Sequence, residues 1–212
     1  MNVTLISLTK PVVKGPLVTG SDLIGYVARV SNPDNQLNIE TYPKLIKYLT
    51  DNDHWSPLEM ADATVEIKTT RDIARQMLRH RSFTFQEFSQ RYAEVAELSE
   101  PKWARRQDTK NRQNSIDDID AEIQWSWKDA QMEIMDLTES IYEWALRQGI
   151  AKECARVILP EGLTPTTLYM KGNFRSWLHY LELREDEATQ LEHRQIALEI
   201  RKVLAEHEEF FR

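Results

Sequence analysis

Apolar and polar residues alternate in some stretches of the chain and recur at helical spacing in others. Alternation with β-branched residues predicts strands at 2–8, 61–68 and within 162–172. Helical spacing predicts helices at 23–31, 44–52, 118–148, 150–159, 173–183 and 186–209. With no internal repeat and no linker, this mixture predicts one α+β domain over 1–212. We expect a mixed central sheet packed with helices, including long C-terminal helices.

The helix expected at 118–148 is the longest element. Its apolar positions are Ile123, Trp127, Met132, Ile134, Leu137, Ile141 and Leu146. Gly149 is expected to end it. The polar stretch before it, about 96–120, has the composition of a variable and mobile loop.

The stretch from Arg71 to Tyr92 has the most concentrated chemistry, with five arginines in 22 residues. Its first half predicts a helix that carries Arg71, Arg75 and Arg79 on one face. Its second half predicts a strand in which Glu87, Ser89 and Arg91 share a face. Arginine offers a planar fork of donors that matches phosphate oxygens. This corner is therefore a predicted anion-binding site.

Composition limits the ligands that such a site serves. The net charge is -7, with 41% hydrophobic and 29% charged residues, which argues against general nucleic-acid or anionic-membrane binding. The single cysteine, Cys154, excludes an intramolecular disulfide and a Cys-rich metal site and fits a cytoplasmic setting. No apolar run has the length of a membrane span, and the N-terminus does not resemble a signal peptide. No His, Cys and carboxylate set has metal-ligand spacing.

The spacing of the basic motif is specific. Arg79-His80-Arg81, seven residues, Ser89, one residue and Arg91 resembles the signature of the flavin-dependent thymidylate synthases. Further segments are similar to that family, so the resemblance covers nearly the whole chain: 28–31, 54–60, 154–160, 173–184 and 189–190. The stretch 96–120 lies outside it.

The resemblance implies a reductive methylation of dUMP to dTMP. The carbon comes from methylenetetrahydrofolate, and FAD reduced by NADPH supplies the hydride, which no side chain can donate. It also implies a homotetramer with active sites shared between subunits. This chemistry needs no cysteine nucleophile, and Cys154, beside Ala155 and Val157, is expected to be a core residue.

The resemblance also implies residue roles. Those expected to bind the flavin are Ser56, Arg79, His80, Arg81, Glu87, Asn173, Arg175 and His179. Those expected to bind dUMP are Gln76, Arg79, Glu87, Ser89, Arg91, Arg156 and Arg184. Two are given catalytic roles. Arg184 would stabilise an anionic uracil ring while keeping its own proton, and His54 would orient substrate or flavin near the reacting face.

Other interpretations of these residues stay open. The arginines at 79 and 81 could be a solvated helix terminus, and Arg156 could belong to a structural ion pair. Ser89 would be a nucleophile only with a base such as His80 in reach. His193 and His207 are predicted to lie on the surface.

Rival functions are a phosphohydrolase in which Glu59 or Glu87 activates water or a metal, and a protein with a buried ion-pair network. A third is a nucleic-acid binder that stacks bases on aromatic residues, namely Phe83, Phe85, Phe88 and Tyr92.

Overall fold

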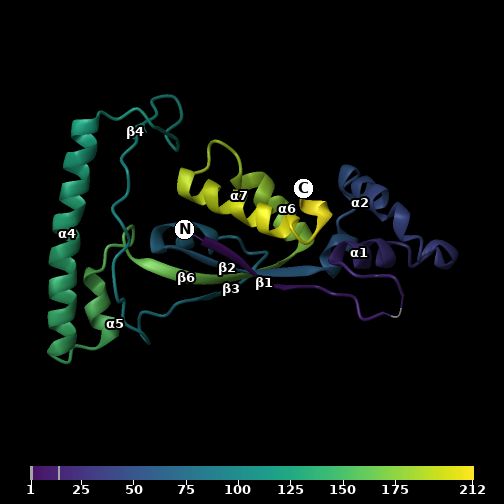
Figure 1. Cartoon of the computed structure of the whole chain (residues 1–212), viewed down its shortest axis with the longest axis horizontal. Helices are drawn as coiled ribbons and strands as arrows, with labels where there is room; N and C mark the ends of the chain where they lie inside the picture. The colour runs from purple at the N-terminus through teal and green to yellow at the C-terminus, as the bar shows by residue number, and fades with distance from the viewer. Residues whose placement is uncertain (1, 14) are drawn as a thin grey trace.

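A central sheet organises the computed structural model, which describes residues 2–13 and 15–212 (Figure 1). Its strands are β1 (Asn2–Leu8), β2 (Asp62–Thr70), β6 (Pro165–Asn173) and β3 (Thr84–Glu87), in that spatial order. Each neighbouring pair is antiparallel, so the sheet is antiparallel and not mixed as expected. The α+β class is confirmed.

One face of the sheet carries the core. Ala63, Val65 and Ile67 of β2 are fully buried, whereas the residues between them point to the other face. The helices α6 (Phe174–Arg184) and α7 (Leu191–Ala205) lie along the covered face in Figure 1. Packing of α6 and α7 against this face sets the positions of the helix ends relative to the strands.

The N-terminal part adds helices at the opposite end of the sheet from α4 (Figure 1). These are α1 (Gly20–Ala28), α2 (Tyr42–Asp51) and the 3-10 turns η1 (Pro33–Asn35), η2 (Ile39–Thr41) and η3 (Ser56–Met60). Thr19 caps α1, because its hydroxyl accepts from the backbone N–H of Asp22. A last turn, η5 (Glu209–Phe211), closes the C-terminus.

The basic stretch folds more tightly than its pattern predicts. Helix α3 spans Arg71–Met77, so Arg79 lies beyond its end. Strand β3 ends at Glu87, and the chain then turns, with the carbonyl of Ser89 accepting from the N–H of Tyr92 at 3.0 Å. Ser89 and Arg91 therefore do not share a strand face with Glu87, which corrects the expected register.

The longest helix, α4 (Ala121–Arg147), stands across one end of the sheet (Figure 1). Gly149 follows it with φ of +77°, as a glycine after a helix end often does. The short elements α5 (Lys152–Ala155) and η4 (Arg156–Ile158) replace the helix expected over 150–159. A small hairpin, β4 (Arg106–Gln107) with β5 (Ser115–Ile116), precedes α4.

An extended segment, residues 94–105, runs alongside α4 and is called the strap. Its backbone is hydrogen-bonded to glutamines of the helix: Gln131 contacts both N and O of Lys102 at 2.9 Å, and Gln124 contacts Ala104. The stretch expected to be a mobile loop thus has defined contacts. Because the strap belongs to no helix or sheet, its backbone N–H and C=O groups need other polar partners. The glutamine amides on the inner side of α4 supply them.

The apolar side of α4 consequently faces outward. Six of the seven apolar positions named from the sequence are 41% to 62% exposed: Ile123, Trp127, Met132, Ile134, Leu137 and Ile141. Only Leu146 packs inward, beside Tyr142. Among the described residues, no helix is both long and apolar enough to cross a membrane.

Candidate active site

The ends of α3 and α6 form a pocket with the turn that follows α6. This cavity of about 870 Å³, the arginine pocket, is lined by Gln76, Arg79, His80, Gln113, Glu182, Leu183, Arg184, Asp186, Ala188, Thr189 and Gln190. Four of the residues predicted to bind ligands therefore meet here: Gln76, Arg79, His80 and Arg184.

A directed hydrogen bond fixes Arg184. Its Nε donates to Nε2 of His80 at 2.9 Å. Burial, together with the charge of Arg184, lowers the pKa of His80 to about 4. His80 is thus a neutral imidazole that accepts at Nε2. This hydrogen bond engages only Nε of the Arg184 guanidinium. The two terminal nitrogens of Arg184 have no protein acceptor among residues 2–13 and 15–212 and remain for a ligand.

The arginines of the basic stretch divide into two kinds. Arg71 and Arg75 are structural, since Arg71 pairs with Glu87 at 3.3 Å and Arg75 pairs with Glu161. Arg79, Arg81 and Arg91 are exposed, and within the described part of the chain none has a carboxylate within 4.0 Å. Within the basic stretch, the arginines without a carboxylate partner among the described residues are those at the signature positions.

Arg156 behaves in the same way. It begins η4, is half-buried, and forms no ion pair with the described residues. The structural ion pair that was one interpretation of Arg156 is therefore absent from residues 2–13 and 15–212, whereas the anion-ligand interpretation stays open.

Glu87 and Ser89 lie at the end of β3, away from the arginine pocket lining. Besides its pair with Arg71, Glu87 accepts from the hydroxyl of Thr166 at 3.0 Å, so its carboxylate has structural partners. Ser89 is exposed in its turn, and no hydrogen bond joins its hydroxyl to His80 in the described structure. This geometry offers no base for a serine nucleophile.

A further set of predicted residues surrounds the start of α6. The side-chain oxygen of Asn173 caps the helix by accepting from the N–H of Ser176 at 2.9 Å, which leaves its amide nitrogen free for other contacts. Arg175 pairs with Glu59 of η3. The ring of His179 lies 4.7 Å from that of Trp55, next to exposed Ser56.

The structure does not bring all the predicted residues together. The start of α6 is separated from Arg184 by the length of the helix, about 16 Å. His54 is exposed and packs edge-on against Tyr48 at 5.9 Å, outside the lining of the arginine pocket. Within one chain most of the predicted residues thus lie at three places, namely the arginine pocket, the end of β3 and the start of α6, whereas Arg156 lies on η4.

Two expectations about single residues are wrong. Cys154 is exposed on the short helix α5 and is not a core residue. His193 is fully buried and not on the surface, whereas His207 is exposed as expected. The pattern of α7 contained the signal, because His193 lies on the same face as Ile196, Ile200 and Leu204.

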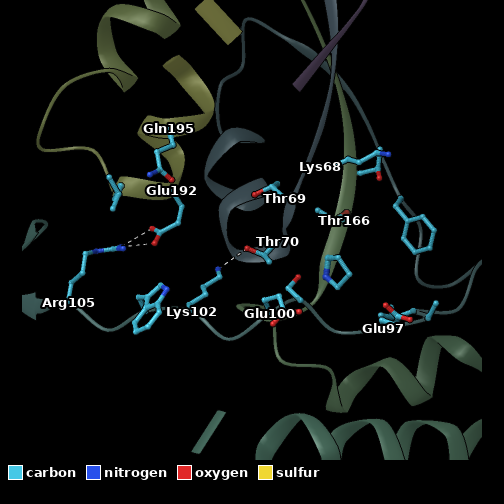
Figure 2. Close-up of a pocket in the computed structure, with 18 of the residues that line it drawn as sticks. Lys68, Thr69, Thr70, Glu97, Glu100, Lys102, Arg105, Thr166, Glu192 and Gln195 are labelled. Carbon is cyan, nitrogen blue, oxygen red and sulfur yellow. Dashed lines mark hydrogen bonds and ion pairs between the residues drawn. The ribbon is translucent and has the colours of Figure 1, made fainter. Parts of the chain in front are cut away.

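A larger cavity, of about 1190 Å³, lies between the strap, the ends of β2 and β6, and α7. In Figure 2, Arg105 of the strap reaches Glu192 of α7, and Lys102 reaches Thr70 at the end of β2. None of the residues predicted to bind ligands lines this cavity, so size alone does not identify the site. Among the described residues, no group of three or more His, Cys, Asp or Glu is arranged to hold a metal ion.

Known proteins with similar sequences cover nearly the whole chain. Residues 17–207 match the family described as thymidylate synthase complementing protein. A flavin-dependent thymidylate synthase of Synechocystis sp. is 53% identical over 98% of this chain and 95% of its own length. A probable flavin-dependent thymidylate synthase of Paramecium bursaria Chlorella virus 1 is 53% identical over 93% of this chain and 90% of its own length.

A solved structure shares the fold. The crystal structure of a UMP/dUMP methylase from Streptomyces cacaoi, bound with 5-Br UMP, superposes with a TM-score of 0.82 at 23% identity, covering 99% of this chain and 91% of that one. The fold, the signature positions that carry unpaired arginines and the two 53% identical relatives agree with one another. On this basis the chain belongs to the flavin-dependent thymidylate synthase family.

Proposed function

We propose that the protein methylates dUMP to dTMP, with methylenetetrahydrofolate as the carbon donor and FAD reduced by NADPH as the source of hydride. One observation carries this proposal: Arg184 is oriented by neutral His80 in a pocket that also holds Gln76 and Arg79. Support comes also from the names of the relatives, which include a flavin-dependent thymidylate synthase and, for the fold, a dUMP methylase.

Arg184 would act on the pyrimidine ring. Its free terminal nitrogens are hydrogen-bond donors only. A uracil ring that gains electrons or loses its N3 proton becomes negative, and a fixed guanidinium stabilises that charge without moving. His80 contributes by holding the edge of Arg184 in place.

The phosphate of dUMP requires cations, and the chain supplies them locally despite its net charge of -7. Arg79, Arg81, Arg91 and Arg156 have no carboxylate partner among the described residues, which leaves their charge for a ligand. We assign Ser89, Arg91 and Arg156 to the dUMP phosphate and sugar, and Glu87 to a polar contact.

The residues expected to hold FAD fit such a cofactor by their chemistry. Around the start of α6 they offer an unused amide nitrogen on Asn173, the hydroxyl of Ser56 and the paired rings of Trp55 and His179. These are donors and aromatic faces suited to a flavin dinucleotide. When bound, FAD supplies hydride chemistry that side chains lack. We assign His54 to orienting substrate or flavin.

We also propose a homotetramer with sites shared between subunits. The three groups of site residues lie apart within one chain, so a second copy would have to bring complementary groups together. The outer face of α4 has apolar residues at alternating spacings of four and three, as in helices that pair with helices. These exposed positions are Ile123, Trp127, Ala130, Ile134, Leu137, Ile141 and Trp144.

Purified protein tests the proposal directly. We expect a yellow protein with a flavin spectrum that dUMP perturbs, and dTMP formation that requires NADPH and methylenetetrahydrofolate together. Colourless protein that gains no FAD on soaking would contradict the proposal. So would a flavoprotein whose spectrum and turnover do not respond to dUMP.

A further inference from the structure

His193 is a buried polar residue with two polar partners. It lies in the first turn of α7 and is 0% exposed. One ring nitrogen, Nε2, is 3.0 Å from the hydroxyl of Tyr180, and the other, Nδ1, is 3.2 Å from Oε1 of Gln76. Gln76 lines the arginine pocket, so His193 stands directly behind a residue of the site.

The direction of these hydrogen bonds follows from the carboxylate of Glu192, which is linked to His193 through Gln190 and Gln76. Glu192 pairs with Arg105 at 2.7 Å and can only accept. Gln190 therefore donates from Nε2 to the Glu192 carboxylate, at 3.0 Å. Its Oε1 accepts from Nε2 of Gln76, at 2.6 Å. With its nitrogen committed to Gln190, Gln76 turns Oε1 to His193. His193 must then donate from Nδ1.

The opposite end is compatible with this tautomer. Burial raises the pKa of the Tyr180 phenol, so the hydroxyl keeps its proton and can donate to Nε2 of His193. Burial, with the charge of Arg184, lowers the pKa of His193 to about 3, so the ring is neutral. A neutral ring that carries its proton on Nδ1 accepts at Nε2. The contacts of Gln76 thus select the tautomer, and Tyr180 can complete it.

This polarity decides how Gln76 faces the pocket. A glutamine amide can present oxygen and nitrogen in two opposite arrangements of similar shape. Here His193 and Gln190 together select one arrangement, which leaves one N–H and one oxygen lone pair of Gln76 unused by these bonds. A site residue with a fixed donor and a fixed acceptor reads a ligand in one orientation only.

We propose that His193 is a positioning residue, whose Nδ1–H holds the Gln76 amide in the orientation that binds the pyrimidine nucleotide. The inference rests on the proposed function, because dUMP is the ligand whose binding reports it. Leucine at position 193 would fill the core but leave Oε1 of Gln76 without its donor and leave the amide free to rotate.

Three variants separate positioning from packing. His193→Asn keeps an amide nitrogen at the depth of Nδ1, whereas His193→Gln places its nitrogen at the depth of Nε2, and His193→Leu keeps neither. The affinity for dUMP is measured by the change in the flavin spectrum, and the FAD content of each variant reports folding. His207→Asn, at an exposed histidine just after α7, is the matched control.

We expect His193→Leu and His193→Gln to weaken dUMP binding by roughly tenfold, the effect of one buried hydrogen bond. His193→Asn should stay within about threefold of the wild type, since the Gln76 contact is retained. If His193 acts through Gln76, adding His193→Leu to Gln76→Ala should cause no further loss. If His193→Leu fails to bind FAD, the dUMP affinities of His193→Asn and His193→Gln decide whether the contact with Gln76 matters.

Equal dUMP affinity of the wild type and His193→Leu would overturn this inference and leave the proposed function standing. So would an Asn variant as weak as the Gln variant, or fully additive losses with Gln76→Ala. Wild-type protein that binds neither FAD nor dUMP would instead overturn the proposed function, and the inference with it.

Discussion

Individual residues in this chain differ more by their partners than by their type. Arg71 and Arg184 are both arginines of the site region, yet Arg71 neutralises Glu87 while Arg184 is held by an uncharged imidazole. A guanidinium without a carboxylate partner is costly to half-bury unless an anion shares its site. Arg184 is therefore the residue whose loss should matter most to the reaction and least to the fold.

Replacing Arg184 with alanine tests its role. We expect dTMP formation to fall by roughly 100-fold or more, as for the loss of a donor that stabilises developing charge, while FAD content changes little. The control is Arg147→Ala, which removes an exposed arginine paired only within α4. Turnover is measured with saturating dUMP, and an unchanged rate in Arg184→Ala would exclude the proposed role.

Half-buried His80 and buried His193 predict a dependence of stability on pH. In the folded chain the pKa values are about 4 for His80 and about 3 for His193, against an ordinary value of 6.5. Between these values and 6.5 the unfolded chain binds protons that the folded chain does not. The free energy of unfolding should therefore fall as the pH is lowered from about 6.5 to 4.

Denaturant unfolding between pH 4 and pH 7 measures this loss. His193→Asn, which cannot titrate, should show a smaller decline than the wild type over that range. If the free energy of unfolding falls equally with pH in the two proteins, His193 does not contribute to the pH dependence of stability.

At the scale of elements, periodicity identified helices and strands but not which face of α4 is covered. The strap fills the inner side of that helix, where Gln124 and Gln131 bind its backbone. The apolar residues lie on the side that none of residues 2–13 and 15–212 covers. Covering them removes apolar surface from water, which favours association by about 1.5–3 kcal/mol for each fully buried large side chain.

Leu137→Glu on α4 tests whether this face joins subunits. We expect a lower mass in solution, because a carboxylate would have to be buried in an apolar contact. The helix itself should persist, since Leu137 is 62% exposed within one chain. The control, Asp136→Lys, changes an exposed neighbour that lies about 100° away around the helix. An unchanged mass by light scattering for Leu137→Glu would place the interface elsewhere.

At the scale of the whole molecule, the residues assigned to the site lie on different elements. Arg184 lines the arginine pocket, Arg91 follows β3, and Asn173 starts α6. Both β3 and α6 pack on the same core, so the fold sets their relative positions. The proposed assembly of several copies would bring groups from different elements into one site.

Mixed oligomers test this division. Arg184→Ala and Arg91→Ala should each be inactive alone, but co-expression should restore activity if one site takes the two residues from different copies. With random assembly, about a quarter of the sites would have both arginines. Activity is compared with each variant expressed alone at the same protein concentration. Co-expressed protein as inactive as either parent would show that both residues come from one copy.

The amino-acid sequence by itself determined the class of fold, the strands β1 and β2, the extent of α4 and the signature positions. These are local properties, since periodicity and spacing follow from backbone geometry and from the chemistry of each residue type. The motif of Arg79, His80, Arg81, Ser89 and Arg91 was readable for the same reason.

Only the tertiary structure decided which arginines are paired, where the strap lies and that His193 stands behind Gln76. These depend on contacts between residues far apart in the chain, such as the 117 positions that separate Gln76 from His193. A pattern along the chain predicts that a face is apolar or basic, but the neighbour that covers it comes from the packing of other elements. Packing thus exposed the face of α4 and buried a histidine.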